Sequence, residues 1–142
     1  MLTPDQKGTV AELAIAFAAS KLGVGVYRPL NDGERYDMIL EIRGRLLRVQ
    51  CKSAARYADG VVIRCFSSRR ARSGLVRRLY TCAEVDAIAA YCLELDRCFL
   101  LPMSVLEGHP EVRLRLRPAR NNQRLGIRWG DEFDFAATLR AL

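Results

Sequence analysis

The chain has 142 residues, half of them hydrophobic, and carries 23 Lys or Arg against 16 Asp or Glu for a net charge of +7. A chain of this length buries enough apolar surface for one core, so the composition excludes a disordered protein and predicts a single domain over residues 1–142. Twenty of the basic residues are arginine. Because the guanidinium group pairs with phosphate through two donors, this bias favours a polyanionic partner, although a GC-rich genome produces the same bias.

The cysteines and apolar segments indicate the compartment. The five cysteines are odd in number and form no C-x-x-C pair, which is typical of reduced thiols, and the single histidine, His109, argues against a zinc site. Asp5, Lys7 and Glu12 interrupt any signal-peptide pattern. No apolar stretch approaches the ~20 residues that cross a bilayer. We therefore expect a soluble cytoplasmic protein that does not bind membranes.

A helix is predicted over residues 4–22, with Pro4 in its first turn and Gly23 at its end. Between residues 10 and 19 every side chain is apolar except Glu12. A helix with apolar residues around its whole circumference is expected to be buried on nearly all sides. Burying a carboxylate without a cationic partner is costly, so Glu12 is either a functional residue or lies on a side that faces water.

A β-hairpin is predicted after the helix. A strand over residues 24–29 leads to a turn at residues 31–33. The segments 36–43 and 46–53 alternate in the manner of strands, and Gly44 lies in the short turn between them. This region is therefore expected to form two antiparallel strands.

The loop of this hairpin decides which side chains meet. A two-residue loop over residues 43–44 pairs Asp37 with Gln50, and one over residues 44–45 pairs Asp37 with Lys52. Both registers place the three polar side chains on one face. A three-residue loop would remove this arrangement, because a shift by one residue reverses every side chain.

The rest of the chain predicts further β-structure. The expected elements are strands at residues 61–66, 98–103 and 113–117, a strand or short helix at 85–93, a polar loop at 67–78, and an unassigned terminal segment at 127–142.

Arginines gather in two of these segments and are candidates for contacting nucleic acid. Asn and Gln side chains in the turn after the last strand can read adenine edges, although Asn also favours turns for conformational reasons. Tyr57 and Tyr80 flank the polar loop and either stack on a base or pack internally. The candidate DNA-binding residues are Arg69, Arg70, Arg72, Arg77, Arg78, Arg113, Arg115, Arg117, Asn121 and Gln123.

The polar set on the hairpin predicts metal-dependent phosphodiester chemistry. Such hydrolysis needs a divalent cation held by oxygen ligands, an activated water and positive charge near the phosphate. Mg²⁺ binds one or two carboxylates together with waters. Lys52 would orient the water or stabilise developing charge. The alternative is that these are solvated strand residues, with Asp37 paired to Arg35. The expected ligands of Mg²⁺, with Mn²⁺ as a substitute, are Glu12, Asp37, Gln50 and the backbone carbonyl of Cys51.

Residues 8–53 resemble the PD-(D/E)XK nuclease superfamily, through Gly8–Glu12, Glu34–Asp37 and Val49–Lys52. The resemblance is to its small branch with a Gln-x-Lys motif, represented by group I intron homing endonucleases, which are similar in fold to Holliday-junction resolvases. Residues 85–86, 99–102, 113–117 and 121–123 also look like that branch. The resemblance therefore extends over most of the chain.

The resemblance implies an α/β (α+β) fold with a restriction-endonuclease-like core, in which an N-terminal helix is followed by a mixed central β-sheet flanked by helices. It implies a metal-dependent DNA endonuclease that forms a dimer or tetramer. Its catalytic residues would be Glu12, Asp37, Gln50 and Lys52. Gln50 stands where the superfamily usually has an acid, and a neutral amide is a weaker ligand for a hard cation.

Three functions are consistent with these features. The first is a homing-type endonuclease that cuts duplex DNA, and the second is a Holliday-junction resolvase that uses the same site. The third is a non-catalytic DNA-binding module in which Gln50 marks a lost metal site.

Overall fold

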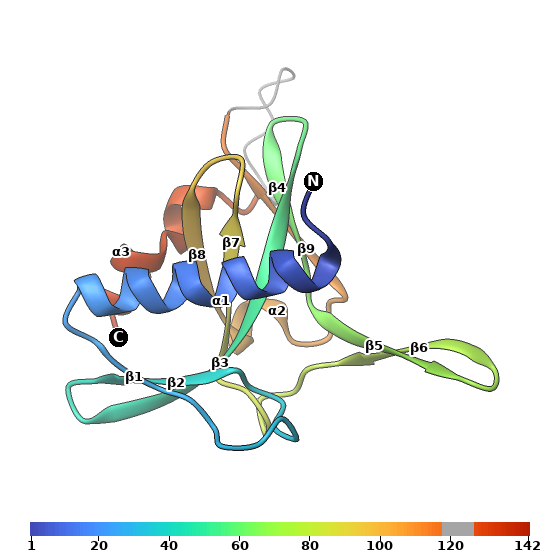
Figure 1. The fold of residues 1–142 in the computed structure, drawn as a ribbon. Coiled ribbons are helices and arrows are strands. Elements are labelled where there is room, and N and C mark those ends of the chain that lie inside the picture. Colours follow the sequence, from blue (N-terminus) through green and yellow to red (C-terminus); the bar gives the residue numbers. More distant parts are fainter. Residues whose placement is uncertain (118–126) are drawn as a thin grey trace.

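The computed structural model, which describes residues 1–117 and 127–142, has an α+β fold built on a mixed seven-stranded sheet (Figure 1). Helix α1 lies across one face of this sheet. The described elements are α1 (Pro4–Lys21), β1 (Gly25–Tyr27), β2 (Met38–Ile42), β3 (Arg45–Tyr57), β4 (Gly60–Arg64), β5 (Phe66–Ala71), β6 (Gly74–Leu79), β7 (Ala87–Cys92), β8 (Arg97–Pro102), α2 (Met103–Leu106), β9 (Glu111–Arg115), the 3₁₀ helix η1 (Gly130–Phe133) and α3 (Phe135–Arg140).

Helix α1 occupies the predicted range and begins with a capping box. The Gln6 backbone N–H donates to Thr3 Oγ1 at 3.2 Å, and the Thr3 N–H donates to Gln6 Oε1 at 2.9 Å. The expectation that α1 is buried on nearly all sides was wrong, because Leu13 and Phe17 are 63% and 65% exposed. The sheet covers only one stripe of the helix, at spacings of four residues. No helix in the described ranges has the length and apolar character needed to span a membrane.

The β2–β3 hairpin adopts the first of the two predicted registers. Ile42 pairs with Arg45, and Met38 pairs with Val49. The two loop residues, Arg43 and Gly44, have φ angles of 51° and 77°. Two positive φ angles define the turn that best fits the twist of a two-residue hairpin.

Strand β3 is the central strand and changes partners along its length. Residues 45–49 pair with β2, residues 49–54 pair in parallel with β7, and residues 55–57 pair with β4. Because β2 begins at Met38, which pairs with Val49, and β4 pairs only with residues 55–57, residues 50–54 of β3 have no partner strand on the β2 edge within the described part of the chain. This open edge is where the predicted polar residues lie.

The core is divided between the two faces of the sheet. One cluster, which includes Ile15, Leu40 and Cys51, lies between α1 and the sheet, and the other, which includes Ile88 and Phe99, lies on the opposite face. Every residue of β7 is buried. Residues 87–92 are therefore a strand and not the short helix that their alanines also allowed, because an interior strand paired on both edges is covered on both faces.

The predicted polar loop at residues 67–78 was wrong. This segment forms a two-stranded ribbon, β5–β6, which projects from the body of the protein (Figure 1). Gly74, with a φ of 109°, follows its turn. Neither strand has a buried face, so the alternation of apolar and polar residues that identifies a strand is missing.

Candidate active site

Asp37 lies directly before β2, at the open edge of β3. Its backbone N–H donates to the Val49 carbonyl at 2.9 Å, and its Oδ2 accepts the backbone N–H of Cys51 at 2.9 Å. The N–H and C=O of one residue in an extended strand point to the same edge. The Cys51 carbonyl is therefore directed to the edge at which the Asp37 carboxylate lies, as its predicted role as a metal ligand requires.

Glu12 approaches this edge from α1. Its carboxylate accepts a hydrogen bond from Arg28 at 3.0 Å and is about one third exposed. Burial raises the pKa of Glu12, and the negative charge of Asp37 raises it further, although Arg28 opposes both effects. The two carboxylates are thus close enough to repel each other.

The pKa of Asp37 is also raised, chiefly by burial. The Cys51 N–H and the positive charges of Lys52 and Arg28 act in the opposite direction but do not cancel the effect of burial. The neighbouring positive charges therefore do not fully compensate for the burial of the Asp37 carboxylate.

Gln50 and Lys52 lie on the face of β3 that points away from α1. The Cys51 side chain packs in the α1 cluster, and neighbouring side chains of a strand point to opposite faces. The Lys52 ammonium donates to the Phe66 carbonyl at 2.9 Å and lies 5.0 Å from the centre of the Tyr80 ring. Tyr80 is 3% exposed, so it is a packing residue and does not stack on a base.

The predicted residues therefore lie around one sheet edge. Gln50 and Lys52 share a face of β3, as the hairpin register predicted, Asp37 binds the Cys51 N–H at the edge, and Glu12 from α1 lines the same cleft as Asp37. Arg35 does not pair with Asp37; its guanidinium lies 3.5 Å from Glu84.

Sequence reasoning missed Arg28. Its side chain lines a cleft of about 190 Å³ together with Glu12, Asp32, Glu34 and Asp37. The signal was available, because a lone acid in an apolar helix needs a nearby cation and Arg28 follows the helix by only seven residues.

The donor set fits a hard divalent cation. Glu12 and Asp37 supply two carboxylates with raised pKa values, which burial causes in both and which the charge of Asp37 increases further in Glu12. Mg²⁺ needs no complete protein cage, since waters and substrate oxygens fill the remaining positions. In the described ranges no three His, Cys, Asp or Glu residues form a cluster suited to a metal, so a thiolate or imidazole site of the zinc type is not formed there.

The candidate DNA-binding arginines fall into two groups. On the ribbon, Arg69, Arg70, Arg72 and Arg77 are exposed, and Arg78 pairs with Glu84 at 2.7 Å. On and after β9, Arg113 and Arg117 are exposed, whereas Arg115 lies 3.7 Å from Asp59. Asn121 and Gln123 lie outside the described residues.

Comparisons with known proteins agree with this geometry. No curated protein matches the chain. Among solved structures, the bacterial homing endonuclease I-Ssp6803I is similar, with a TM-score of 0.79 and 26% identity over 98% of this chain and 93% of that chain. The sequence profile of the PD-(D/E)XK endonucleases matches residues 2–136. The chain therefore belongs to the PD-(D/E)XK endonuclease family.

Proposed function

We propose that this endonuclease is Mg²⁺-dependent and cuts duplex DNA at specific sites, as a homing endonuclease does. The observation that carries the proposal is the Asp37 carboxylate, fixed to the Cys51 N–H at an open sheet edge between Glu12 and Lys52. The likeness to I-Ssp6803I over nearly the whole chain supports the same substrate class. The proposal treats residues 1–142 as one nuclease domain.

The metal would be held by Glu12, Asp37, the Gln50 side-chain oxygen and the Cys51 carbonyl. When bound, it supplies a Lewis acid that activates water and neutralises phosphate charge. Lys52 carries the positive charge that orients the water or stabilises charge developing on phosphate oxygens. Arg28 forms an ion pair with the Glu12 carboxylate, and this ion pair would have to loosen for Glu12 to bind the metal.

The ribbon supports duplex DNA as the substrate. The major groove admits a two-stranded β-ribbon, and this ribbon carries exposed arginines on both strands and in its turn. We assign Arg69, Arg70, Arg72, Arg77 and Arg78 to phosphate or base contacts. Arg113, Arg115 and Arg117 would form a second contact surface, with Asn121 and Gln123 beside it in the sequence.

Cutting both strands of a duplex calls for two active sites, and each chain provides one. We therefore extend the proposal to a dimer or tetramer. Sedimentation of the protein with and without duplex DNA tests this part independently of cleavage.

The test of function begins with selection. Duplexes from a randomised library are enriched by binding in Ca²⁺, and the enriched duplex is then incubated with Mg²⁺ or Mn²⁺ beside a synthetic four-way junction. The proposal predicts metal-dependent cleavage of the duplex and none with Asp37→Ala. Preferential cleavage of the junction would replace it with a resolvase function, and tight binding without cleavage in any metal would replace it with a non-catalytic module.

A further inference from the structure

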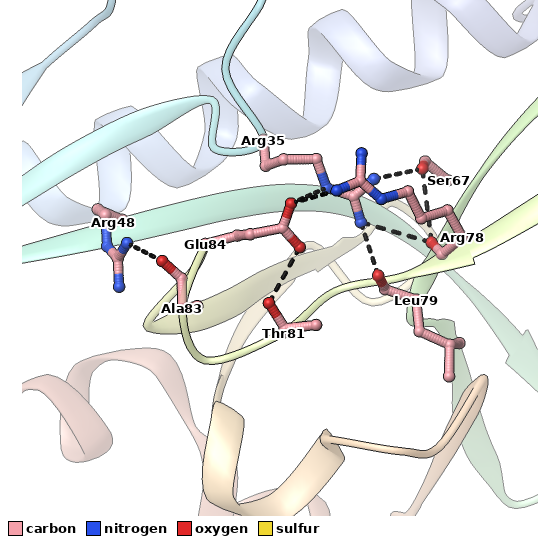
Figure 2. Close-up of polar contacts among 8 residues, drawn as sticks. All are labelled: Arg35, Arg48, Ser67, Arg78, Leu79, Thr81, Ala83 and Glu84. Carbon is pink, nitrogen blue, oxygen red and sulfur yellow. Dashed lines mark hydrogen bonds and ion pairs between the residues drawn. The ribbon is translucent and has the colours of Figure 1, made fainter.

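Arg35 binds the base of the ribbon more extensively than any exposed arginine on it. Its guanidinium donates to Ser67 Oγ at 2.9 Å on β5 and to the Leu79 carbonyl at 2.8 Å on β6 (Figure 2). The side chain is only 17% exposed. One residue from outside the ribbon thus ties both of its strands together where they leave the body.

Tyr80 and Glu84 fix the position of the Arg35 guanidinium. Its guanidinium carbon lies 4.1 Å from the centre of the buried Tyr80 ring, and Glu84 lies beside its Nε at 3.5 Å. Glu84 is itself bound by Arg78 at 2.7 Å and by the Thr81 hydroxyl at 3.0 Å (Figure 2). Burial and several partners leave Arg35 little freedom to move independently of the ribbon.

The same region reaches the active site by two short routes. Arg35 lies two residues before Asp37 in the segment that leads into β2. Lys52 shares the Tyr80 ring with Arg35 and donates to the Phe66 carbonyl at the start of β5. Displacement of the ribbon base would therefore act on both the carboxylate and the ammonium proposed for catalysis.

We propose that Arg35 is a positioning residue for DNA cleavage, which joins the base of the ribbon to the segment that carries Asp37. The scissile phosphate of DNA bound by the ribbon is thereby placed correctly relative to the active site. This inference rests on the proposed function, because it concerns the same site. We assign Arg35 no contact with substrate or metal, because its guanidinium nitrogens are directed to the ribbon base and Glu84.

Three variants test it. Arg35→Lys keeps the charge over Tyr80 but cannot reach both ribbon strands with a planar fork. Ser67→Ala removes one ribbon contact of Arg35 and introduces only a small side chain at a partly buried position. Thr81→Ala is the matched control, because it removes a hydroxyl that donates to Glu84 and leaves both ribbon contacts of Arg35 in place.

The readouts separate positioning from binding. DNA affinity is measured in Ca²⁺, and the single-turnover rate constant is measured in Mg²⁺ at saturating duplex. Misplacement of reacting groups by about 1 Å costs on the order of 10²-fold in rate, so we expect Arg35→Lys to lose about 30- to 100-fold in rate with affinity within about threefold. Ser67→Ala should lose about threefold in rate, and Thr81→Ala should match the wild type.

A third readout does not require cleavage. Amide exchange of the Cys51 N–H, which is bonded to Asp37, should accelerate about tenfold in Arg35→Lys, while β8 amides such as that of Leu100 keep their wild-type rates. Wild-type cleavage by Arg35→Lys, or a loss confined to affinity, overturns the inference. If the wild-type protein cuts no DNA, the proposed function fails, and Cys51 exchange alone decides the coupling: acceleration supports it and an unchanged rate refutes it.

Discussion

Strand β3 is flanked by two aspartates in matching positions with opposite electrostatics. Asp37 precedes β2 and accepts the Cys51 N–H at 2.9 Å, and Asp86 precedes β7 and accepts the Arg48 N–H at 2.8 Å. The pKa of Asp37 is raised, chiefly by burial, whereas that of Asp86 is lowered, chiefly by its hydrogen bond to the Arg48 side chain.

The difference lies in the cation that each site provides. The Arg48 guanidinium binds Asp86 through Nε at 3.1 Å and Nη2 at 3.0 Å, and it also donates to the Ala83 carbonyl at 2.7 Å in the loop that precedes Asp86 (Figure 2). No side chain in the described ranges makes a comparable ion pair with Asp37. One aspartate is thus neutralised by the fold, whereas the other has no such ion pair, as the proposed role of Asp37 as a metal ligand requires.

The largest expected effect comes from removing the Asp37 charge. Asp37→Asn retains an oxygen that can accept the Cys51 N–H but removes a metal ligand worth several kcal/mol of transition-state stabilisation, so cleavage should fall by about 10³-fold or more. Single-turnover assays in Mg²⁺ measure this loss. In Asp86→Asn the rate should stay within about tenfold, and equal losses in the two variants would erase the proposed distinction.

Lys52 should have the next largest effect. Lys52→Met keeps much of the apolar stem against Tyr80 but removes the ammonium, and loss of one such stabilising group costs about 10² to 10³-fold in rate. DNA affinity in Ca²⁺ should change little, because this ammonium faces the ribbon base. An unimpaired rate would mean that Lys52 serves only to hold the Phe66 carbonyl.

The pH dependence of metal binding should reveal the raised pKa values. Protonated carboxylates do not bind Mg²⁺, and Glu12 and Asp37 take up protons at higher pH than their ordinary values of 4.5 and 3.8. Apparent Mg²⁺ affinity, measured by calorimetry, should therefore weaken as the pH falls toward these raised pKa values. Affinity that is constant down to pH 4.5 would contradict a site built on these two groups.

The smallest effects concern stability without metal. Because the pKa of Asp86 is lowered, its ion pair stabilises the protein above the ordinary pKa of 3.8, and this contribution is lost as the pH falls through the lowered value. Asp86→Asn should therefore lower stability by about 1 kcal/mol at pH 7, a value reduced by solvent screening of a partly exposed pair.

Asp37→Asn should do the opposite. Its raised pKa means that the charged form is disfavoured above this pKa and that the penalty disappears on protonation. In the absence of metal, the variant should be as stable as the wild type or more stable at pH 7. Thermal denaturation of both variants in EDTA measures the two changes in stability. Destabilisation by Asp37→Asn would indicate a purely structural carboxylate.

The sequence predicted those parts of the fold that depend on local patterns. The range of α1 followed from Pro4 and Gly23, and the β2–β3 register followed from a two-residue loop that contains Gly44. The ribbon could not be predicted in this way, because its strands bury no face and its residues show no apolar alternation.

The sequence analysis proposed Glu12, Asp37, Gln50 and Lys52 for the site, and only part of their arrangement could be predicted. Because alternate residues of a strand point to the same face, the sequence predicted that Gln50 and Lys52 share a face of β3. The pairing of Lys52 with the Phe66 carbonyl and of Arg35 with the ribbon base joins separate elements of the fold. Such contacts depend on how β3 changes partners, which no local pattern records.

Calorimetric titration of Mg²⁺ and Mn²⁺ into the wild-type protein and its Asp37→Asn and Asp86→Asn variants at pH 8 tests the central claim most directly. The account predicts binding to the wild type and to Asp86→Asn, and none to Asp37→Asn. Metal binding that survives in Asp37→Asn, or that depends on Asp86, would contradict the assignment of the open edge of β3 as the cation site.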